Sequence, residues 1–486
     1  QHALAHPARG CQADEQIGAV GHDRALLHVQ ARPRRHAKEK LRHAPFPGVG
    51  MARRQKRRVH ARQRDEFAQE FFGFGHGEPK RQRARRVKRP RAGVEPGIAT
   101  AAAADYSGGR MNKLPRPWVA WLSLCLAAGW SAGECLAATN ASSLRERFAG
   151  RFLVGVALDG RLPDAYSTAE QELITRQFDA LTPANCMKMM HVQRVEGQFD
   201  FELADAFMAF AARNKQKACG HCLVWAKDER TPPWIFRDNG QTVTREKLLE
   251  RMRAHIETVA GRYRGKLISW DVVNEPLDDG QEYLRPSQWV TLTGEEFIVQ
   301  AFEDAHRVDP DAVLVLNDYN IEQPAKRKKL LRLLQTLLDR KAPIHAVGIQ
   351  GHFELDAIPW QDLEDTIVSI RDLGLQVMIT ELDIDVVLRS KWWADNGKHR
   401  PELAKYDPFA QGCPPEVLQR QAEKYRRLFE LFSRYDKTIR RVAFWDLHDG
   451  RSWLNDFPWR RVNHPLLFDR QARPKPAFEA VIQPFK

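Results

Sequence analysis

From about residue 143 onward, short apolar segments alternate with amphipathic stretches. Eight of the segments are almost continuously hydrophobic, as strands buried in a parallel sheet are. They span residues 152–157, 178–181, 218–225, 267–273, 312–316, 346–349, 376–380 and 441–445. The stretches between them favour helices. In the clearest, residues 416–435, one face carries Leu418, Ala422, Tyr425, Leu428 and Phe432.

This alternation predicts the fold class. Eight strands, each followed by a helix, in one domain of roughly 340 residues predict an α/β protein with a (β/α)8 TIM barrel. We place this single catalytic domain at residues 143–486. A doubly wound open sheet is the alternative. No glycine-rich phosphate-binding motif follows an early strand, which counts against a nucleotide-binding protein.

Composition excludes wholesale disorder, because 43% of the 486 residues are hydrophobic. The net charge of +14 would suggest a nucleic-acid binder, but the excess is confined to residues 1–110, which hold 24 basic and 10 acidic side chains. The remaining residues carry 52 of each sign. Because the folding part is neutral, we expect no nucleic-acid partner.

The first 138 residues are not expected to belong to the barrel. Residues 1–110 show no sustained periodicity, so we expect a disordered or non-native upstream extension; a basic arm for nucleic acid is the alternative. Residues 111–138 have the layout of a signal peptide: a basic start, an apolar run at 118–130 and small residues near Ala138. That run is shorter than the roughly 20 residues that span a bilayer. We therefore expect a secreted or periplasmic monomer, with no membrane contact after cleavage.

Four of the seven cysteines, Cys186, Cys219, Cys222 and Cys413, follow the expected cleavage point. Cys219 and Cys222 form a CxxC inside a predicted strand, whereas redox pairs lie at a helix start. We expect buried structural cysteines. No second close pair accompanies them, so zinc is not indicated. We expect neither a metal nor an organic cofactor.

Two carboxylates follow predicted strands: Glu275 after residues 267–273 and Glu381 after residues 376–380. In a barrel, the C-terminal ends of the strands meet at the functional face. Glycoside hydrolysis needs a carboxylic acid to protonate the departing oxygen and a carboxylate on the opposite face of the sugar. Either residue alone is equally consistent with a strand cap or an ion pair, so the pair predicts a hydrolase only together with its surroundings.

Aromatic and amide side chains surround the other strand ends. Aromatic faces stack on sugars, while imidazole and amide groups match sugar hydroxyls, so the mixture predicts a carbohydrate cleft. The segments concerned are 220–225 (GHCLVW), 317–320 (NDYN), 348–352 (GIQGH) and 444–446 (FWD), followed by Trp453.

Four motifs carry a resemblance to a known family. Residues 270–276 (WDVVNEP), 317–322 (NDYNIE), 348–352 (GIQGH) and 380–384 (TELDI) resemble the family 10 glycoside hydrolases, chiefly endo-1,4-β-xylanases. The resemblance covers about residues 145–484. It implies a retaining enzyme that cleaves internal β-1,4-xylosidic bonds of xylan or xylo-oligosaccharides by double displacement. Another retaining β-1,4-glycanase of the same clan, or a catalytically weakened carbohydrate-binding protein, is the alternative.

The resemblance also implies roles for individual residues. Glu275 is the expected acid/base and Glu381 the nucleophile, with carboxyl groups about 5 to 5.5 Å apart. His352 is expected to bond Glu381, and Asp383 to orient His352. We expect the charge of Glu381 to help hold Glu275 protonated. Expected substrate-binding residues are Asn185, Lys188, His221, Trp225, Asn274, Tyr319, Gln350, Trp445 and Trp453; Asn274 would hold the sugar 2-hydroxyl and Tyr319 would form the wall near the leaving group.

The chain departs from the family pattern at four positions near this cleft. Ala184, Met189, Ala226 and Asp446 stand where Glu, Trp, His and Gly are usual. Ala184 and Met189 are expected to weaken binding at the second glycone subsite. A lost hydroxyl contact costs on the order of 1 kcal/mol, so we expect affinity or the preferred substitution pattern to differ from the family norm. The long loop 390–415 is expected either to wall the aglycone side or to cover the barrel rim.

Overall fold

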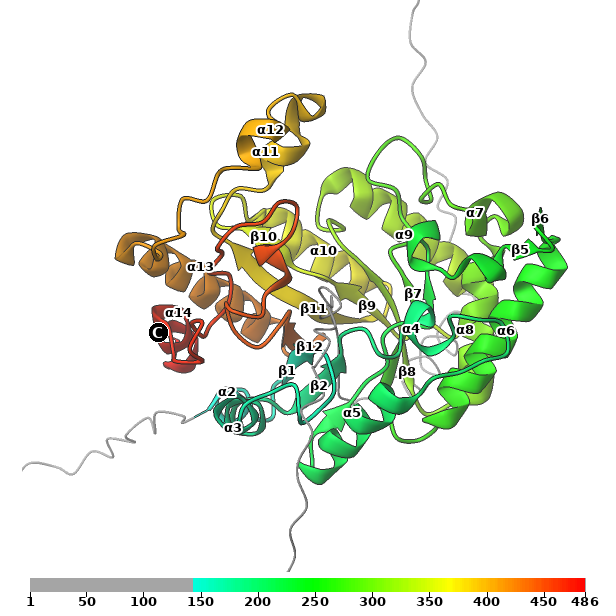
Figure 1. Ribbon diagram of the computed structural model, residues 1–486, viewed down its shortest axis with the longest axis horizontal. Helices are drawn as coiled ribbons and strands as arrows, with labels where there is room; N and C mark the ends of the chain where they lie inside the picture. Colours follow the sequence, from blue (N-terminus) through cyan, green and yellow to red (C-terminus); the bar gives the residue numbers. More distant parts are fainter. Residues whose placement is uncertain (1–142, 486) are drawn as a thin grey trace, which may run out of the picture. The chain divides into compact units, whose positions relative to one another are not determined.

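The computed structural model describes residues 143–485, and within them a closed ring of parallel strands lies inside a layer of helices (Figure 1). The ring is built from β1 (Leu153–Leu158), β2 (Ala180–Pro183), β3 (Lys217–Ala218), β4 (Val224–Trp225), β7 (Ser269–Asn274), β8 (Val313–Asp318), β9 (Ala346–Ile349), β11 (Gln376–Asp385) and β12 (Ile439–Phe444). Each overlaps a predicted apolar run. Their side chains are buried almost without exception, which explains the continuous hydrophobicity.

The pairing order closes the sheet. Strands pair in the order β3-β2-β1-β12-β11-β9-β8-β7-β4, and every pair is parallel. Strands β3 and β4 are consecutive parts of one segment, residues 217–225, which therefore joins the two ends of the path. Between them Gly220 bridges Trp270, where a Cβ atom would overlap the indole ring. The predicted (β/α)8 barrel is confirmed, and the open sheet is excluded.

Helices cover the outside of the barrel. The longer ones are α3 (Thr168–Gln177), α5 (Glu202–Arg213), α6 (Arg245–Arg262), α8 (Glu296–Val308), α9 (Pro324–Asp339), α10 (Trp360–Asp372), α13 (Pro415–Arg434) and α14 (Pro476–Ile482). The predicted face of α13 is buried except for Leu418, which is half-buried because the neighbouring Val417 packs inward instead. Helix α3 begins with a reciprocal capping box between Ser167 and Glu170.

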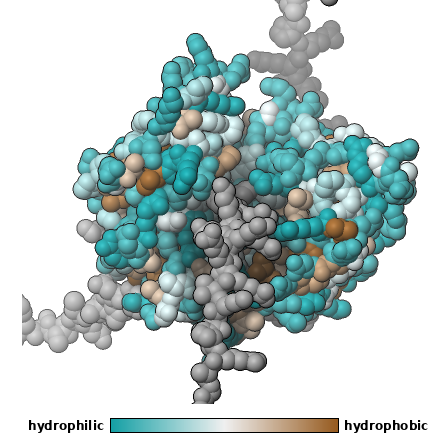
Figure 2. Space-filling model, viewed as in Figure 1, coloured by the Kyte–Doolittle hydropathy of each residue, from teal (hydrophilic) through white to brown (hydrophobic). Residues whose placement is uncertain are grey.

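Short elements occupy the connections. The helices are α2 (Leu144–Arg147), α4 (Met189–Val192), α7 (Gln288–Thr293), α11 (Ser390–Trp393) and α12 (Arg400–Leu403). The 3-10 turns are η1 (Asp228–Arg230), η2 (Pro233–Ile235), η3 (Ala394–Gly397) and η4 (Trp453–Asn455). Strands β5 (Arg237–Asp238) and β6 (Gln241–Thr242) form a small antiparallel ribbon, and β10 (His352–Glu354) pairs with β11. Hydrophilic residues dominate the surface seen in Figure 2, with hydrophobic residues in scattered spots.

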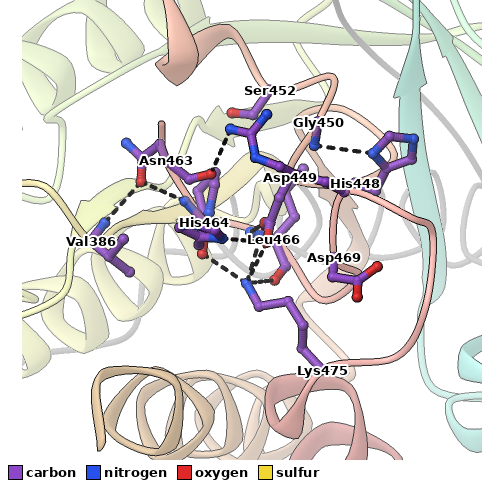
Figure 3. A network of polar contacts seen from close by, with 12 residues as sticks. Val386, His448, Asp449, Gly450, Ser452, Asn463, His464, Leu466, Asp469 and Lys475 are labelled. Atoms are coloured by element: carbon purple, nitrogen blue, oxygen red, sulfur yellow. Dashed lines mark hydrogen bonds and ion pairs between the residues drawn. The ribbon is translucent and has the colours of Figure 1, made fainter. Parts of the chain in front are cut away.

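A buried polar network ties the C-terminal segment to the loop after β12 (Figure 3). Lys475 Nζ lies 2.9 Å from Asp449 Oδ2 and donates to the carbonyl oxygens of His464 and Leu466. The Leu466 N–H donates to Asp449 Oδ1 at 2.8 Å. Burial lowers the pKa of Lys475, and Asp449 opposes that effect. The network fixes the loop that carries Trp453.

Cys186, Cys219 and Cys222 are buried, Cys413 is half-buried, and all four are free thiols. The prediction of buried cysteines, which concerns Cys219 and Cys222, is confirmed. Among residues 143–485, no helix is both long and apolar enough to cross a bilayer, and no cluster of three or more His, Cys, Asp or Glu side chains is arranged to hold a metal ion. The upstream extension and the signal peptide lie outside the described residues and stay predictions.

Candidate active site

Glu381 lies within β11 and is held by two side chains. His352 Nε2 is 2.7 Å from Glu381 Oε2, and Asn317 Nδ2 donates to Glu381 Oε1 at 2.9 Å. The register of β10 on β11 sets His352 beside Asp383, whose Oδ2 lies 2.9 Å from His352 Nδ1. Trp453 Nε1 donates to the same Asp383 oxygen at 2.8 Å. The sequence-based contacts of His352 with Glu381 and Asp383 are therefore present.

The charges of this group are coupled. Burial raises the pKa of Glu381 to about 7, although His352 and the hydrogen bond from Asn317 act in the opposite direction. Burial lowers the pKa of His352, but Asp383 and Glu381 outweigh it and raise that pKa to about 9. Between these two values the Glu381 carboxylate faces an imidazolium, which keeps the carboxylate ionised and fixes its orientation.

Glu275 follows β7 with a φ of 55°, in the left-handed region. Its N–H donates to the Asn317 carbonyl at 2.8 Å. Gln350 Nε2 donates to Glu275 Oε1 at 3.3 Å, and Lys227 Nζ lies 3.2 Å from Glu275 Oε2. Arg285 lies 3.8 Å from the same oxygen. The backbone conformation directs the carboxyl group into this cluster of donors.

The expectation that Glu381 helps to hold Glu275 protonated is wrong. Burial raises the pKa of Glu275, but Lys227 and Arg285, with Gln350 as a hydrogen-bond donor, outweigh it and lower the pKa to about 2. The two cations, with the hydrogen bond from Gln350, have a stronger effect on the pKa of Glu275 than its burial. The two carboxylates do lie in different environments, but the pKa of Glu381 is the raised one and the pKa of Glu275 the lowered one, which is the reverse of the expectation.

Four of the expected substrate-binding residues form one connected group. Lys188 Nζ donates to Asn185 Oδ1 at 3.0 Å and lies 4.8 Å from the centre of the Trp225 ring. The His221 ring lies 6.4 Å from that of Trp225. His221 Nδ1 is 2.8 Å from Asp271 Oδ2, and both side chains are wholly buried. Burial, with Lys188, lowers the pKa of His221 well below its usual value, so its imidazole is neutral.

Two tryptophans flank His352. The Trp445 ring stands nearly perpendicular to the His352 ring at 5.6 Å and to the His221 ring at 6.4 Å. The Trp453 ring lies 4.9 Å from His352. The expected nucleophile, Glu381, thus lies near indole and imidazole rings, which is consistent with a site that stacks on sugar faces.

Tyr319 and Asn274 lie near the expected acid/base. The Tyr319 hydroxyl accepts a hydrogen bond from Arg285 at 2.8 Å and donates one to Asp279, so Tyr319 shares a partner with Glu275. Asn274 Oδ1 accepts a hydrogen bond from Asn317 at 2.8 Å. Each of the thirteen predicted site residues thus has a hydrogen bond, an ion pair or a ring contact with another of them, either directly or through one intermediate residue.

Sequence reasoning assigned no individual role to four contact residues: Asn317, Asp271, Lys227 and Arg285. Asn317 bonds both Glu275 and Glu381, and it ends an apolar run as the predicted site residues do, a signal that could have revealed it. Asp271 is a lone carboxylate within an apolar strand, which is also a usable signal. Lys227 and Arg285 lie in loops without periodicity, and no pattern in the sequence marks them.

Asp446, one of the four departures from the family pattern, lies beside a cavity. Asp159 Oδ2 accepts from Asn185 at 3.3 Å, and Asp446 Oδ2 accepts from the Trp453 N–H at 3.0 Å. Both aspartates line a cavity of about 530 Å³, and Asp159 joins it to Asn185. Asp446 has a φ of 77°, which explains why glycine is usual there.

The long loop 390–415 covers the barrel rim. Its Trp392 ring stacks on Trp459 at 5.3 Å, and Trp459 Nε1 donates to the Tyr406 carbonyl at 2.8 Å. These contacts join the loop to the segment after β12, so they support the second of the two expectations for this loop.

The barrel and its paired carboxylates place the protein in the class of glycoside hydrolases. The family model described as glycosyl hydrolase family 10 matches residues 143–484. The chain belongs to this family. An endo-1,4-beta-xylanase from Geobacillus stearothermophilus is 41% identical over 345 residues, which is 70% of this chain and 98% of the relative. Endo-1,4-beta-xylanase B from Paenibacillus barcinonensis is 36% identical over 347 residues, covering 71% and 98%.

The solved structures agree with this assignment. A GH10 endoxylanase retrieved from a sugarcane soil metagenome has a TM-score of 0.65 and 35% identity, and the match covers 70% of this chain and 99% of that one. A mutant structure in complex with xylotriose has a TM-score of 0.64 and 33% identity, covering 71% and 100%.

Proposed function

We propose that the protein is a secreted, monomeric, retaining endo-1,4-β-xylanase that hydrolyses internal β-1,4 bonds of xylan. The observation that carries the proposal is the linkage of Glu275 and Glu381 through Asn317 at the C-terminal end of the barrel. Relatives named endo-1,4-beta-xylanase that this chain matches over nearly their whole length support xylan as the substrate. The apolar run at 118–130 supports export.

In the first step, which needs the protonated form of Glu275, a Glu381 oxygen attacks the anomeric carbon. Glu275, which has taken up a proton from solvent, gives that proton to the departing glycosidic oxygen. The bond from the anomeric carbon to that oxygen breaks, and a glycosyl ester forms on Glu381. His352 and Asn317 hold the two Glu381 oxygens, so the attacking group is ionised and oriented before substrate arrives.

In the second step, Glu275 removes a proton from water, and the resulting oxygen attacks the anomeric carbon to release Glu381. The ion pair with Lys227 already holds Glu275 as a carboxylate, the form this step needs. Asn274 holds the sugar 2-hydroxyl, whose hydrogen bond strengthens as positive charge develops on the ring.

Reducing-sugar release from xylan, with cellulose and mannan in parallel, tests this proposal. The parent protein should prefer xylan, and Glu381→Gln should reduce the rate by at least about 1000-fold with the same thermal unfolding curve. Proton NMR during hydrolysis should show the β-anomer first.

Each alternative gives a different result. A preference for cellulose or mannan identifies another glycanase of the clan, and the α-anomer appearing first excludes the retaining mechanism. Binding of xylan without hydrolysis by the folded parent protein identifies a carbohydrate-binding protein.

A further inference from the structure

Lys227 lies in the loop after β4, with its ammonium group beside the acid/base carboxyl. Its Nζ is 3.2 Å from Glu275 Oε2, and the side chain is 26% exposed. The same Nζ lies 5.9 Å from the centres of the Trp225 and Tyr319 rings. Among residues 143–485, Glu275 is the only carboxylate with which Lys227 forms an ion pair.

The loop backbone holds this arrangement in place. The Lys227 N–H donates to the Trp225 carbonyl at 2.8 Å, and its own carbonyl accepts from the Thr231 hydroxyl at 2.9 Å. The 3-10 turn η1 follows directly. A lysine fixed at its backbone and packed between two rings is positioned by the fold for one carboxylate.

Other charged and titratable groups face Glu275 from neighbouring elements. Arg285 reaches it from the segment after β7, but its Nε donates to the Glu275 carbonyl at 2.9 Å and another of its nitrogens to Tyr319. The remaining groups that act on Glu275 or sense its charge are Asp318 and Tyr319 at the end of β8, Glu381 in β11 and Cys222 before β4. Of the two cations, Lys227 is closer to the carboxylate.

We propose that Lys227 is a positioning residue that holds Glu275 as an oriented carboxylate, favouring its action as base over its action as acid. This inference rests on the proposed function, because it concerns the two roles of Glu275 in one catalytic cycle. Burial alone would raise the pKa of Glu275, and the cations reverse the direction. An opposite charge at this distance shifts a carboxyl pKa by about one to three pH units.

A direct titration tests the charge effect without any need for activity. The full chain carries ¹³C-labelled glutamate carboxyls, with Glu381→Gln to remove the neighbouring titration, and Glu275→Gln to assign the signal. Lys227→Met should raise the pKa of Glu275 by at least about one pH unit. Lys227→Arg should restore most of the difference, and the exposed Lys391→Met should change nothing. A pKa within 0.3 of the parent value in Lys227→Met overturns the inference.

Kinetics test the effect on the acid role. With an aryl xylobioside that has a poor leaving group, kcat/KM depends on general-acid catalysis by protonated Glu275. Lys227→Met should increase the protonated fraction and therefore raise kcat/KM about tenfold near neutral pH. With a dinitrophenyl leaving group, the glycosylation rate should stay within about twofold. An equal loss on both substrates means a merely structural role and overturns the inference.

The two experiments separate the inference from the proposed function. If the titration shifts as expected but the parent protein cleaves no xylan, the proposed function fails while the hold of Lys227 on Glu275 stands. If xylan is cleaved but the titration does not shift, only the inference fails.

Discussion

Replacing Asn317 with alanine removes a side chain that connects three parts of the active site. Its Nδ2 donates to Glu381 Oε1 at 2.9 Å and to Asn274 Oδ1 at 2.8 Å, while its Oδ1 accepts from Thr380 at 2.7 Å. A hydrogen bond to a charged group contributes about 1.5 to 3 kcal/mol. If that contribution is lost in the transition state, kcat/KM should fall roughly 10- to 150-fold.

The same substitution should change the pH profile. The hydrogen bond from Asn317 lowers the pKa of Glu381, which burial has raised to about 7. Without the bond this pKa rises further, so a smaller fraction of Glu381 is ionised at a given pH. The acidic limb of kcat/KM should therefore move to higher pH in Asn317→Ala.

The assay is kcat/KM for an aryl xylobioside between pH 4 and 10, with thermal unfolding as a check on the fold. Thr380→Val is the matched control, since it removes a partner of Asn317 without a direct bond to Glu381, and it should reduce kcat/KM by less than about fivefold. A loss under threefold in Asn317→Ala, with an unmoved acidic limb, would refute the reasoning.

Three further predictions concern stability. The pKa of His352, raised from 6.5 to about 9, implies about 3 kcal/mol of stability below pH 6.5 that is lost as pH rises through 9; the difference in unfolding free energy between the parent protein and His352→Asn should shrink over that range. Asp449→Asn or Lys475→Met should each cost about 3 to 5 kcal/mol in denaturant unfolding, because each leaves a buried charge unpaired, and the double variant should cost less than the sum. Gly348→Ala should cost about 1 to 3 kcal/mol and also lower kcat, because its Cβ would overlap Asn317 Oδ1; an unchanged melting temperature would contradict this.

The barrel could be predicted from the sequence because its strands are buried on both faces. Every strand of the ring corresponds to a run of apolar residues in the sequence, and eight such runs with helices between them allow few other folds. The end of β11 could not be predicted. The strand continues through Asp385, and acidic residues inside a strand interrupt an apolar run. The structure satisfies them with distant partners: Arg461 lies 2.8 Å from Asp385, and His352 lies between Glu381 and Asp383.

The same contrast holds for the active site. Glu275 and Glu381 could be found because they lie at the C-terminal ends of strands, which meet at one face of the barrel. The strands themselves follow from the hydrophobic pattern. Their charges could not be found in this way. The resting state of Glu275 depends on Lys227 and Arg285, which reach it from two separate loops. A pKa depends on distances of a few ångströms between side chains, and loop sequences without periodicity do not encode such distances in any visible pattern. The resemblance to a family therefore indicates which carboxylates are expected to react. The protonation state of each carboxylate before the reaction depends on this chain's own loops, and for Glu275 it depends on Lys227 in particular.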